Sequence, residues 1–158
     1  MGTEPHTVQT VTVRGMTIDD LPRVFHLGEK LFTLQRFPNL YRVWDEFEVI
    51  DTFSGNPDHC FVAVDAADRV VGFFLASIIE KRHSPRYGYL KWLGVDKAYE
   101  GQGIAQHLFT TFYAIMENEE IPMLLVDTEA INTRALRFFE RQGFSSPRDH
   151  FFLTLKLK

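Results

Sequence analysis

The chain of 158 residues contains a single cysteine, Cys60. One cysteine excludes an intrachain disulfide and agrees with a reducing cytoplasm, which is the location we expect. Cys60 lies in the apolar run 60–64, where a small buried side chain is a more usual role than a nucleophile. The six histidines show no His-x-x-x-His spacing, and a Cys-x-x-Cys pair is absent, so we expect no metal site.

A basic excess and long apolar runs are also absent. The 17 Lys and Arg residues are outnumbered by 21 Asp and Glu residues, which gives a formal net charge of −4. A general nucleic-acid binder needs a basic face, so we expect no nucleic-acid partner, with the local cluster at 81–86 as an open exception. Since no apolar run approaches the length of a membrane span, we expect no membrane partner. Residues 1–6 match neither a signal peptide nor a myristoylation site, and we expect them to form a flexible N-terminus.

Hydrophobic residues make up 45% of the chain and aromatic residues 14%, enough for one well-filled core. We therefore expect a single domain over residues 7–158. The periodicity alternates between strand and helix. Strands are expected near 8–12, 60–64, 70–79, 87–95, 123–128, 144–148 and 150–158, and helices at 17–32, 42–52, 104–118 and 132–143.

The most informative segment is the junction between the strand at 87–95 and the helix that follows it. Gly101 and Gly103 stand in the turn, where glycine lets the backbone approach a ligand closely. The first turn of a helix also offers amide N–H groups that have no intrahelical partner, and a pyrophosphate binds such groups well. A P-loop is excluded because Ile104 and Ala105 follow Gly103, and a dinucleotide fingerprint is excluded by Gln106.

A second motif occurs about thirty residues later, at 132–144. Asn132 is a natural N-cap, and Gly143 stands where a helix ends in a left-handed residue. The two motifs read V-x-x-x-Y-x-G-x-G-I-A-x-x-L and N-x-x-A-x-x-F-F-E-x-x-G-F. In this order and separation they resemble the GNAT family of N-acetyltransferases. The resemblance implies an α/β (α+β) fold in which a mixed central sheet of six to seven strands is flanked by about four helices.

The same resemblance implies acetyl-CoA as the co-substrate. Backbone amides of the turn would hold its pyrophosphate, and the end of the preceding strand would align with its pantetheine arm. Asn132 matches the asparagine that contacts the cofactor, and Phe139 lies beside the thiol position. The implied contacts come from Leu93, Gly94, Val95, Gly101, Gln102, Gly103, Ile104, Ala105, Gln106, Asn132 and Phe139.

Two residues depart from the family pattern. Glu100 stands where a glutamine or arginine is usual, which removes a long polar or cationic side chain from near the phosphates. Phe139 stands where many members carry a tyrosine thought to protonate the departing CoA thiolate, and phenylalanine has no proton to give. Solvent, Tyr89 or Tyr99 would have to serve instead.

The acceptor amine must lose a proton before it attacks, so a base is needed. Asp127 is the first candidate, because the ribosomal-protein N-terminal acetyltransferases, which this chain resembles, carry a glutamate there. Glu129, on the same strand face, and Glu80, near the end of the third strand, are the alternatives. For each of them the competing interpretation is a solvated charge at a strand end.

We therefore expect an acyl-CoA-dependent N-acyltransferase that moves an acetyl group to a primary amine by direct attack in a ternary complex. The acceptor is a small molecule, a peptide or a protein, and its site is expected to involve the segments at 34–44 and 81–86. The alternative is a CoA-binding sensor or interaction module without catalysis, which Phe139 favours. A homodimer is left open.

Overall fold

The structure is a computed structural model that describes residues 10–33, 43–145 and 147–157. The chain divides into two compact units, residues 1–126 and 127–158. The predicted flexible N-terminus and most of the predicted acceptor segment at 34–44 lie outside the described residues. The prediction of a single domain over 7–158 therefore stays a prediction.

The first unit is built on a five-stranded sheet in the order β1-β2-β3-β4-β5. The first four strands are antiparallel neighbours, and β5 runs parallel to β4. A parallel neighbour needs a crossover, which the helix between β4 and β5 supplies. The strands are β1 Thr12–Gly15, β2 Cys60–Val64, β3 Val70–Lys81, β4 Ser84–Val95 and β5 Leu124–Val126.

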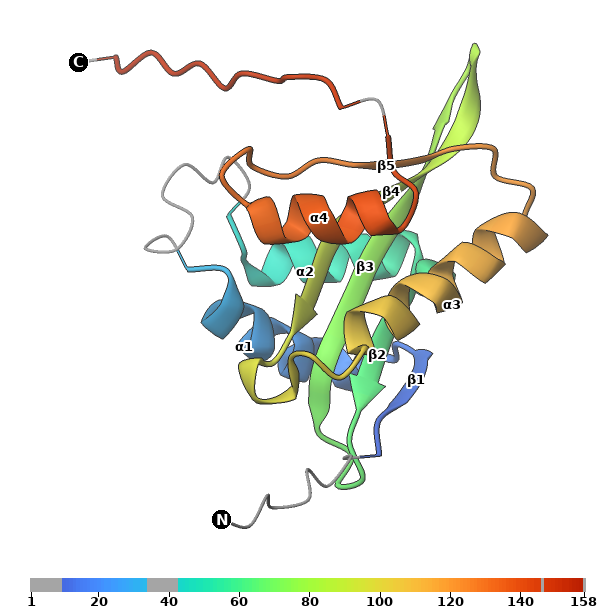
Figure 1. The fold of residues 1–158 in the computed structure, drawn as a ribbon, viewed down its shortest axis with the longest axis vertical. Coiled ribbons are helices and arrows are strands. Elements are labelled where there is room, and N and C mark those ends of the chain that lie inside the picture. Colours follow the sequence, from blue (N-terminus) through green and yellow to red (C-terminus); the bar gives the residue numbers. More distant parts are fainter. Residues whose placement is uncertain (1–9, 34–42, 146, 158) are drawn as a thin grey trace, which may run out of the picture. The chain divides into compact units, whose positions relative to one another are not determined.

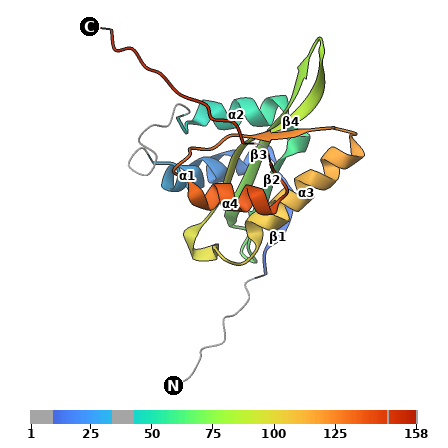
Figure 2. The same cartoon turned by 45° about the horizontal axis from the view of Figure 1, so that its top comes forward.

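Helices cover both faces of this sheet (Figure 1). On one face lie α1 (Leu21–Leu31) and α2 (Glu46–Gly55), and on the other lies α3 (Ile104–Asn118). Figure 2 shows the strands between α2 and α3 from a second direction. Short 3-10 turns precede three of the elements: η1 Ile18–Asp20, η2 Pro57–His59 and η3 Lys97–Tyr99.

Alternating side chains of β3 fill a core on each face of the sheet. Phe73 and Leu75 are fully buried in the cluster that includes Val24 of α1. On the other face the ring of Phe74 lies 4.7 Å from that of Phe112 in α3, measured between centroids. A strand that is buried on both faces shows no polar alternation, which explains its almost continuous apolar sequence.

A β-bulge in β4 interrupts this alternation. Leu75 pairs with Trp92 and Ala76 with Leu90, so Lys91 is the extra residue. A Cβ added at Gly88 would meet Met116 and Phe112 on the α3 face, whereas one added at Gly94 would meet Leu31 on the α1 face. Two positions six residues apart would share a face in a regular strand, so the bulge reverses which side chains face α1 and α2.

The second unit contains α4 (Thr133–Arg141). Its described residues from 144 onward form no strand, although two strands were predicted there, near 144–148 and 150–158. The predicted mixed α/β fold is confirmed, but the sheet has five strands among the described residues rather than six or seven. Alternation sets which side chains share a face, but a strand also needs a partner for its backbone groups. Within the described segment Phe151 is 78% exposed and Leu153 is 91% exposed.

Local signals elsewhere agree with the prediction. The backbone N–H and the hydroxyl of Thr17 both donate to Asp20 at the start of the first helix, at 2.8 and 3.0 Å. The hairpin of β2 and β3 is present, with its turn at 65–69. β3 and β4 form a second hairpin, which was not predicted, and they pair as far as Lys81 and Ser84, beyond the predicted strands at 70–79 and 87–95. The segment at 81–86 is therefore the tip of a hairpin rather than an irregular loop.

Gly28 in α1 provides a test of the core on the α1 face. A Cβ there would lie 2.0 Å from the indole of Trp44, whose Nε1–H donates to the carbonyl of Phe25 at 3.0 Å. Gly28→Ala should lower the free energy of unfolding by about 1 to 3 kcal/mol, because overpacking outweighs the better helix propensity of alanine. Urea unfolding measures this change. Gly55→Ala in α2 is the control, because a Cβ there meets no atom within 4 Å. Equal stability of the two variants would contradict this packing.

Candidate functional site

The turn before α3 has the geometry that its glycines suggest. Gly101 and Gly103 have φ values of 76° and 77°, the left-handed region that favours glycine. A Cβ built at either position would meet no heavy atom within 4 Å. The positive φ values therefore favour glycine at both positions. The space beside each Cα is open among the described residues.

The N-terminus of α3 has no side-chain cap. Gly103 occupies the N-cap position and the helix begins at Ile104. The first hydrogen bond of the helix runs from the N–H of His107 to the carbonyl of Gly103 at 3.0 Å. The amides of Ile104 and Ala105 therefore have no acceptor within the helix. These amides lie at the positive end of the helix dipole, where an anion such as a pyrophosphate binds favourably. The glycine turn and the first turn of α3, residues 101–106, are called the cradle below.

The backbone that leads into the cradle is held by Tyr99, which is buried at the end of η3. Its hydroxyl donates to Oδ2 of Asp65 at 2.8 Å. Asp65 lies 34 residues earlier in the chain, at the turn between β2 and β3. The bond therefore joins that turn to the segment that enters the cradle. Tyr99 is therefore a poor candidate for the proton source of the leaving thiolate, because its hydroxyl proton is engaged by Asp65.

The Asp65 carboxylate accepts further bonds within its own turn. The backbone N–H groups of Ala67 and Arg69 donate to Oδ1, both at 2.9 Å, and the Arg69 Nε donates to Oδ2 at 2.8 Å. The bonds from Arg69, followed by those from Tyr99 and Ala67, hold the pKa of the Asp65 carboxyl well below its ordinary value. The bond to Asp65 in turn raises the pKa of Tyr99.

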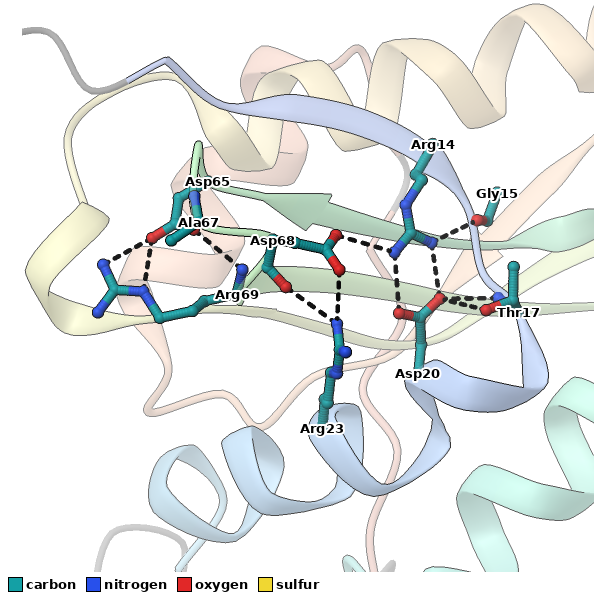
Figure 3. A network of polar contacts seen from close by, with 9 residues as sticks. All are labelled: Arg14, Gly15, Thr17, Asp20, Arg23, Asp65, Ala67, Asp68 and Arg69. Atoms are coloured by element: carbon teal, nitrogen blue, oxygen red, sulfur yellow. Dashed lines mark hydrogen bonds and ion pairs between the residues drawn. The ribbon is translucent and has the colours of Figure 1, made fainter.

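Figure 3 shows that a second set of charges continues from this turn to the start of α1. Asp68 forms ion pairs with Arg14 at 3.7 Å and with Arg23 at 3.2 Å. Arg14 also pairs with the buried Asp20 at 2.7 Å. Burial disfavours the charged form of Asp20, but the bonds from Arg14 and Thr17 outweigh it and lower its pKa. The β2–β3 turn is therefore fixed to both the cradle side and α1.

The edge of β4 that faces β5 is only partly paired. The three pairs are Gly88 with Leu124, Tyr89 with Leu125 and Leu90 with Val126. From Lys91 to Val95, β4 has no β5 partner among the described residues, although Trp92 to Val95 are paired with β3 on the other edge. An unpaired edge presents backbone N–H and C=O groups. Leu93, Gly94 and Val95 lie on this open edge, as an extended polar ligand such as a pantetheine arm would require.

A polar cluster that the sequence did not suggest lies where the open edge begins. The Nε1–H of Trp92 donates to Oε1 of Glu48 in α2 at 3.1 Å, and the Nζ of Lys91 lies 3.6 Å from the same oxygen. Lys91 also donates to the Thr52 hydroxyl at 3.4 Å. Because of the bulge, Lys91 and Trp92 both face α2. A lysine within the apolar run at 90–95 was the one sequence signal of this cluster.

In the second unit, Asn132 caps α4 as predicted. Its Oδ1 accepts a bond from the N–H of Ala135 at 3.2 Å. Gly143 ends the helix with a φ of 95°. The N–H of Gly143 donates to the carbonyl of Glu140, and that of Phe144 donates to the carbonyl of Phe139, both at 3.0 Å. These two bonds define a Schellman motif.

Phe139 has a packing role within this motif. Its ring centroid lies 5.4 Å from that of Phe144 and 5.3 Å from that of Phe138, in edge-on contacts. An apolar contact between the positions of Phe139 and Phe144 commonly accompanies a Schellman motif. Packing at the end of α4 is therefore a sufficient reason for a phenylalanine at position 139.

The three candidate bases lie in different parts of the chain. Asp127 and Glu129 belong to the second unit. Burial raises the pKa of the Asp127 carboxyl above its ordinary value. Glu80 lies on the β3–β4 hairpin, where it pairs with Arg86 at 3.5 Å and its side chain is 67% exposed. Arg86 is five residues from Lys91, or roughly 16 Å along a strand, so the structure does not bring Glu80 to the open edge. Tyr89 lies two residues from Lys91 and on the same face of β4.

Cys60 is fully buried in β2, and burial raises the pKa of its thiol to about 11. A thiol of this kind is a poor nucleophile, as expected. Among the residues that the structure describes, no group of three or more His, Cys, Asp or Glu side chains is placed to bind a metal ion. In the same part of the chain, no helix combines the length and apolar character that crossing a membrane requires.

Comparison with known proteins gives a family match over most of the chain. The profile described as "Acetyltransferase (GNAT) family" matches residues 23–144. N-alpha-acetyltransferase 30 of Schizosaccharomyces pombe is 35% identical over 88 residues, which cover 56% of this chain and 58% of that protein. A mycothiol acetyltransferase of Propionibacterium freudenreichii is 33% identical over 92 residues, 57% of this chain and 28% of its own length. The chain thus matches less than two thirds of either relative.

Solved structures share the fold. A chain in the crystal structure of the NatC complex bound to Gag peptide and CoA has a TM-score of 0.75 and 20% identity, and the match covers 87% of this chain and 86% of that one. An aminoglycoside acetyltransferase from a soil metagenome, in complex with trehalose, has a TM-score of 0.70 and 21% identity, with 92% and 97% covered. At these identities the likeness concerns the fold alone.

The Asp65 cluster predicts a pH dependence of stability. The pKa of Asp65 is lower in the folded than in the unfolded state, so its contribution is present above about pH 4 and is lost as the pH falls through the folded-state pKa. The free energy of unfolding should therefore fall less steeply in acid for Asp65→Asn than for the wild type, and urea unfolding across this range measures both slopes. Asp51→Asn, at an exposed position of α2, should keep the wild-type slope. Identical slopes for wild type and Asp65→Asn would contradict the assignment.

Proposed function

Because the chain belongs to the acetyltransferase (GNAT) family, we propose that it is an acyl-CoA-dependent N-acyltransferase with acetyl-CoA as co-substrate. The observation that carries the proposal is the uncapped N-terminus of α3 behind two glycines with positive φ. The open strand edge at 93–95 and the anion-binding cradle at 101–106 are neighbours along the chain. The pantetheine arm and the pyrophosphate are neighbours in the same way along CoA.

The residues proposed to hold acetyl-CoA fall into two groups. Backbone amides of the turn and first helical turn bind the pyrophosphate, from Gly101, Gln102, Gly103, Ile104, Ala105 and Gln106. The β4 edge at Leu93, Gly94 and Val95 orients the pantetheine arm by strand-like bonds. Asn132 and Phe139 complete the set that the family motif implies. Glu100 does not remove the cradle, because backbone amides rather than its side chain supply the donors.

Acetyl-CoA supplies an activated thioester. In the proposed reaction the nitrogen of a bound primary amine attacks the thioester carbonyl carbon, the C–S bond breaks, and the sulfur leaves as CoA thiolate. An acceptor that arrives as an ammonium ion loses one proton to a base before the attack. Its nitrogen loses a second proton as the amide forms, and the thiolate gains one proton. A thiol with a pKa of about 8.5 is a fair leaving group near neutral pH, so this step does not depend on a tyrosine at position 139. Tyr89, on the α2 face beside Lys91, is the remaining side-chain candidate for delivering that proton.

The acceptor proton is the more demanding one, since a lysine-like amine has a pKa near 10.4. Asp127 is the proposed base, and Glu129 is the alternative in the same unit. The upward shift in the pKa of Asp127 supports this choice, because it makes the carboxylate a stronger base. Glu80 is less favoured, since it pairs with Arg86 on an exposed hairpin.

The acceptor belongs to the class of primary amines, in a small molecule, a peptide or a protein. Relatives named N-alpha-acetyltransferase 30 and mycothiol acetyltransferase share about a third of their aligned residues with this chain. A CoA-binding module without catalysis is the alternative, which the phenylalanine at position 139 favours. Release of free thiol from acetyl-CoA, measured with a panel of amines, amino acids and peptides, separates the two.

The cradle predicts how the protein responds to acetyl-CoA. Binding to the native state raises the melting temperature by mass action. Gly103→Val should abolish this rise, because a β-branched residue is strained at a φ of 77° and places side-chain atoms where the phosphates would lie. Thermal unfolding with and without acetyl-CoA measures the rise. Gly15→Val in β1 is the control, because a Cβ there meets no atom within 4 Å. An undiminished rise in Gly103→Val would place the ligand elsewhere.

Asp127→Asn tests the base. Loss of general-base assistance should lower turnover by about 10² to 10⁴-fold, while the affinity for CoA stays near that of the wild type. Steady-state rates across a pH series measure the effect, which should shrink at high pH, where the free amine is abundant. Glu129→Gln and Glu80→Gln are the comparison variants. Wild-type rates for Asp127→Asn at every pH would exclude Asp127 as the base.

A further inference from the structure

A polar cluster is formed by Glu48, Lys91 and Trp92. None of the three takes part in the proposed binding of acetyl-CoA or in the proposed proton transfers. The cluster lies where the described part of β5 ceases to pair with β4, immediately after the pair of Leu90 and Val126. It combines one carboxylate, one ammonium group and one indole N–H, from two elements of the same compact unit.

The ion pair in this cluster is poorly suited to a purely structural role. The Nζ of Lys91 lies 3.6 Å from the Glu48 oxygen, longer than a strong charge-assisted bond of about 2.8 Å. Both side chains are about a quarter exposed, at 25% and 26%, so the carboxylate is partly desolvated but still accessible to solvent. The indole bond, by contrast, is short enough to fix the carboxylate in place.

The position of the carboxylate matches the demand of the reaction. If CoA binds as proposed, its thioester reaches the region where β4 and β5 part, and the acceptor amine must arrive at the same point. Primary amines are largely protonated near neutral pH, with pKa values of about 8 for an α-amino group and 10.4 for a lysine. A partly desolvated carboxylate attracts such a cation strongly.

We propose that Glu48 is the anionic subsite that holds the ammonium group of the acceptor. Trp92 fixes the carboxylate, and Lys91 neutralises it until the acceptor arrives. The flexible stem of Lys91 and its long bond of 3.4 Å to Thr52 let its ammonium group give way to that of the acceptor. This inference rests on the proposed function and narrows it to acceptors that arrive as cationic primary amines.

Glu48→Gln tests the subsite because the amide oxygen still accepts the Trp92 bond while the charge is lost. The KM for the amine acceptor should rise about 10- to 100-fold, as expected for a lost bond to a charged group. The KM for acetyl-CoA and the melting temperature should stay near wild type. Glu46→Gln, at an exposed position of the same helix, is the matched control and should change neither constant.

Lys91→Met separates binding from structure. Removal of the competing ammonium group should leave the acceptor KM unchanged or lower it, whereas a structural ion pair would lose stability equally from either side. The inference is overturned if Glu48→Gln behaves like Glu46→Gln, or if its loss of activity comes with a lower melting temperature or weaker CoA binding. A wild type that binds acetyl-CoA but converts no amine in the panel would overturn the proposed function, and the inference with it.

Discussion

The arrangement of the first unit depends on one extra residue in β4. Without the bulge at Lys91, Gly88 and Gly94 would face the same helix layer, whereas the structure packs them against α3 and α1 respectively. The reversal brings Lys91 and Trp92 together on the α2 face. Pairing with β3 resumes at Trp92 and continues past the end of the contact with β5. A strand that is firmly held on one edge and open on the other can accept an extended ligand as if it were a further strand.

The segment between β4 and the cradle is held by side-chain hydrogen bonds rather than by strand pairing. The Asp65 carboxylate accepts hydrogen bonds from its own turn and from Tyr99. The β2–β3 turn therefore fixes the segment that leads to Gly101 and Gly103. A carboxylate that accepts several bonds is costly to protonate and costly to displace. The amides at the start of α3 are therefore presented by a backbone that is anchored on the Asp65 side, while the glycines keep freedom only where the ligand would approach.

Local patterns in the sequence predicted the features that depend on local chemistry. The spacing of apolar residues predicted the helices and the hairpin of β2 and β3, and Thr17, Asn132 and Gly143 all act at helix ends as their residue types suggest. The bulge was not predicted, because one extra residue leaves no mark on composition. The bond between Asp65 and Tyr99 joins positions 34 residues apart, which no window of local pattern can reveal. The segment at 150–158 shows the opposite error, because its alternation predicts a strand, whereas its described residues, 150–157, form none.

Neither Glu100 nor Phe139 removes a group that the proposed reaction requires. Backbone amides and a helix N-terminus can bind phosphates without a cationic side chain, so Glu100 removes an accessory contact only. Phe139 has a packing role at the end of α4, and an acid there would assist a thiolate that already leaves readily. The acceptor amine holds its proton about two pKa units more tightly than the thiol if it is lysine-like. The catalytic demand therefore falls on the acceptor side, where a cation must be attracted, held and deprotonated, and carboxylates are the side chains suited to all three steps.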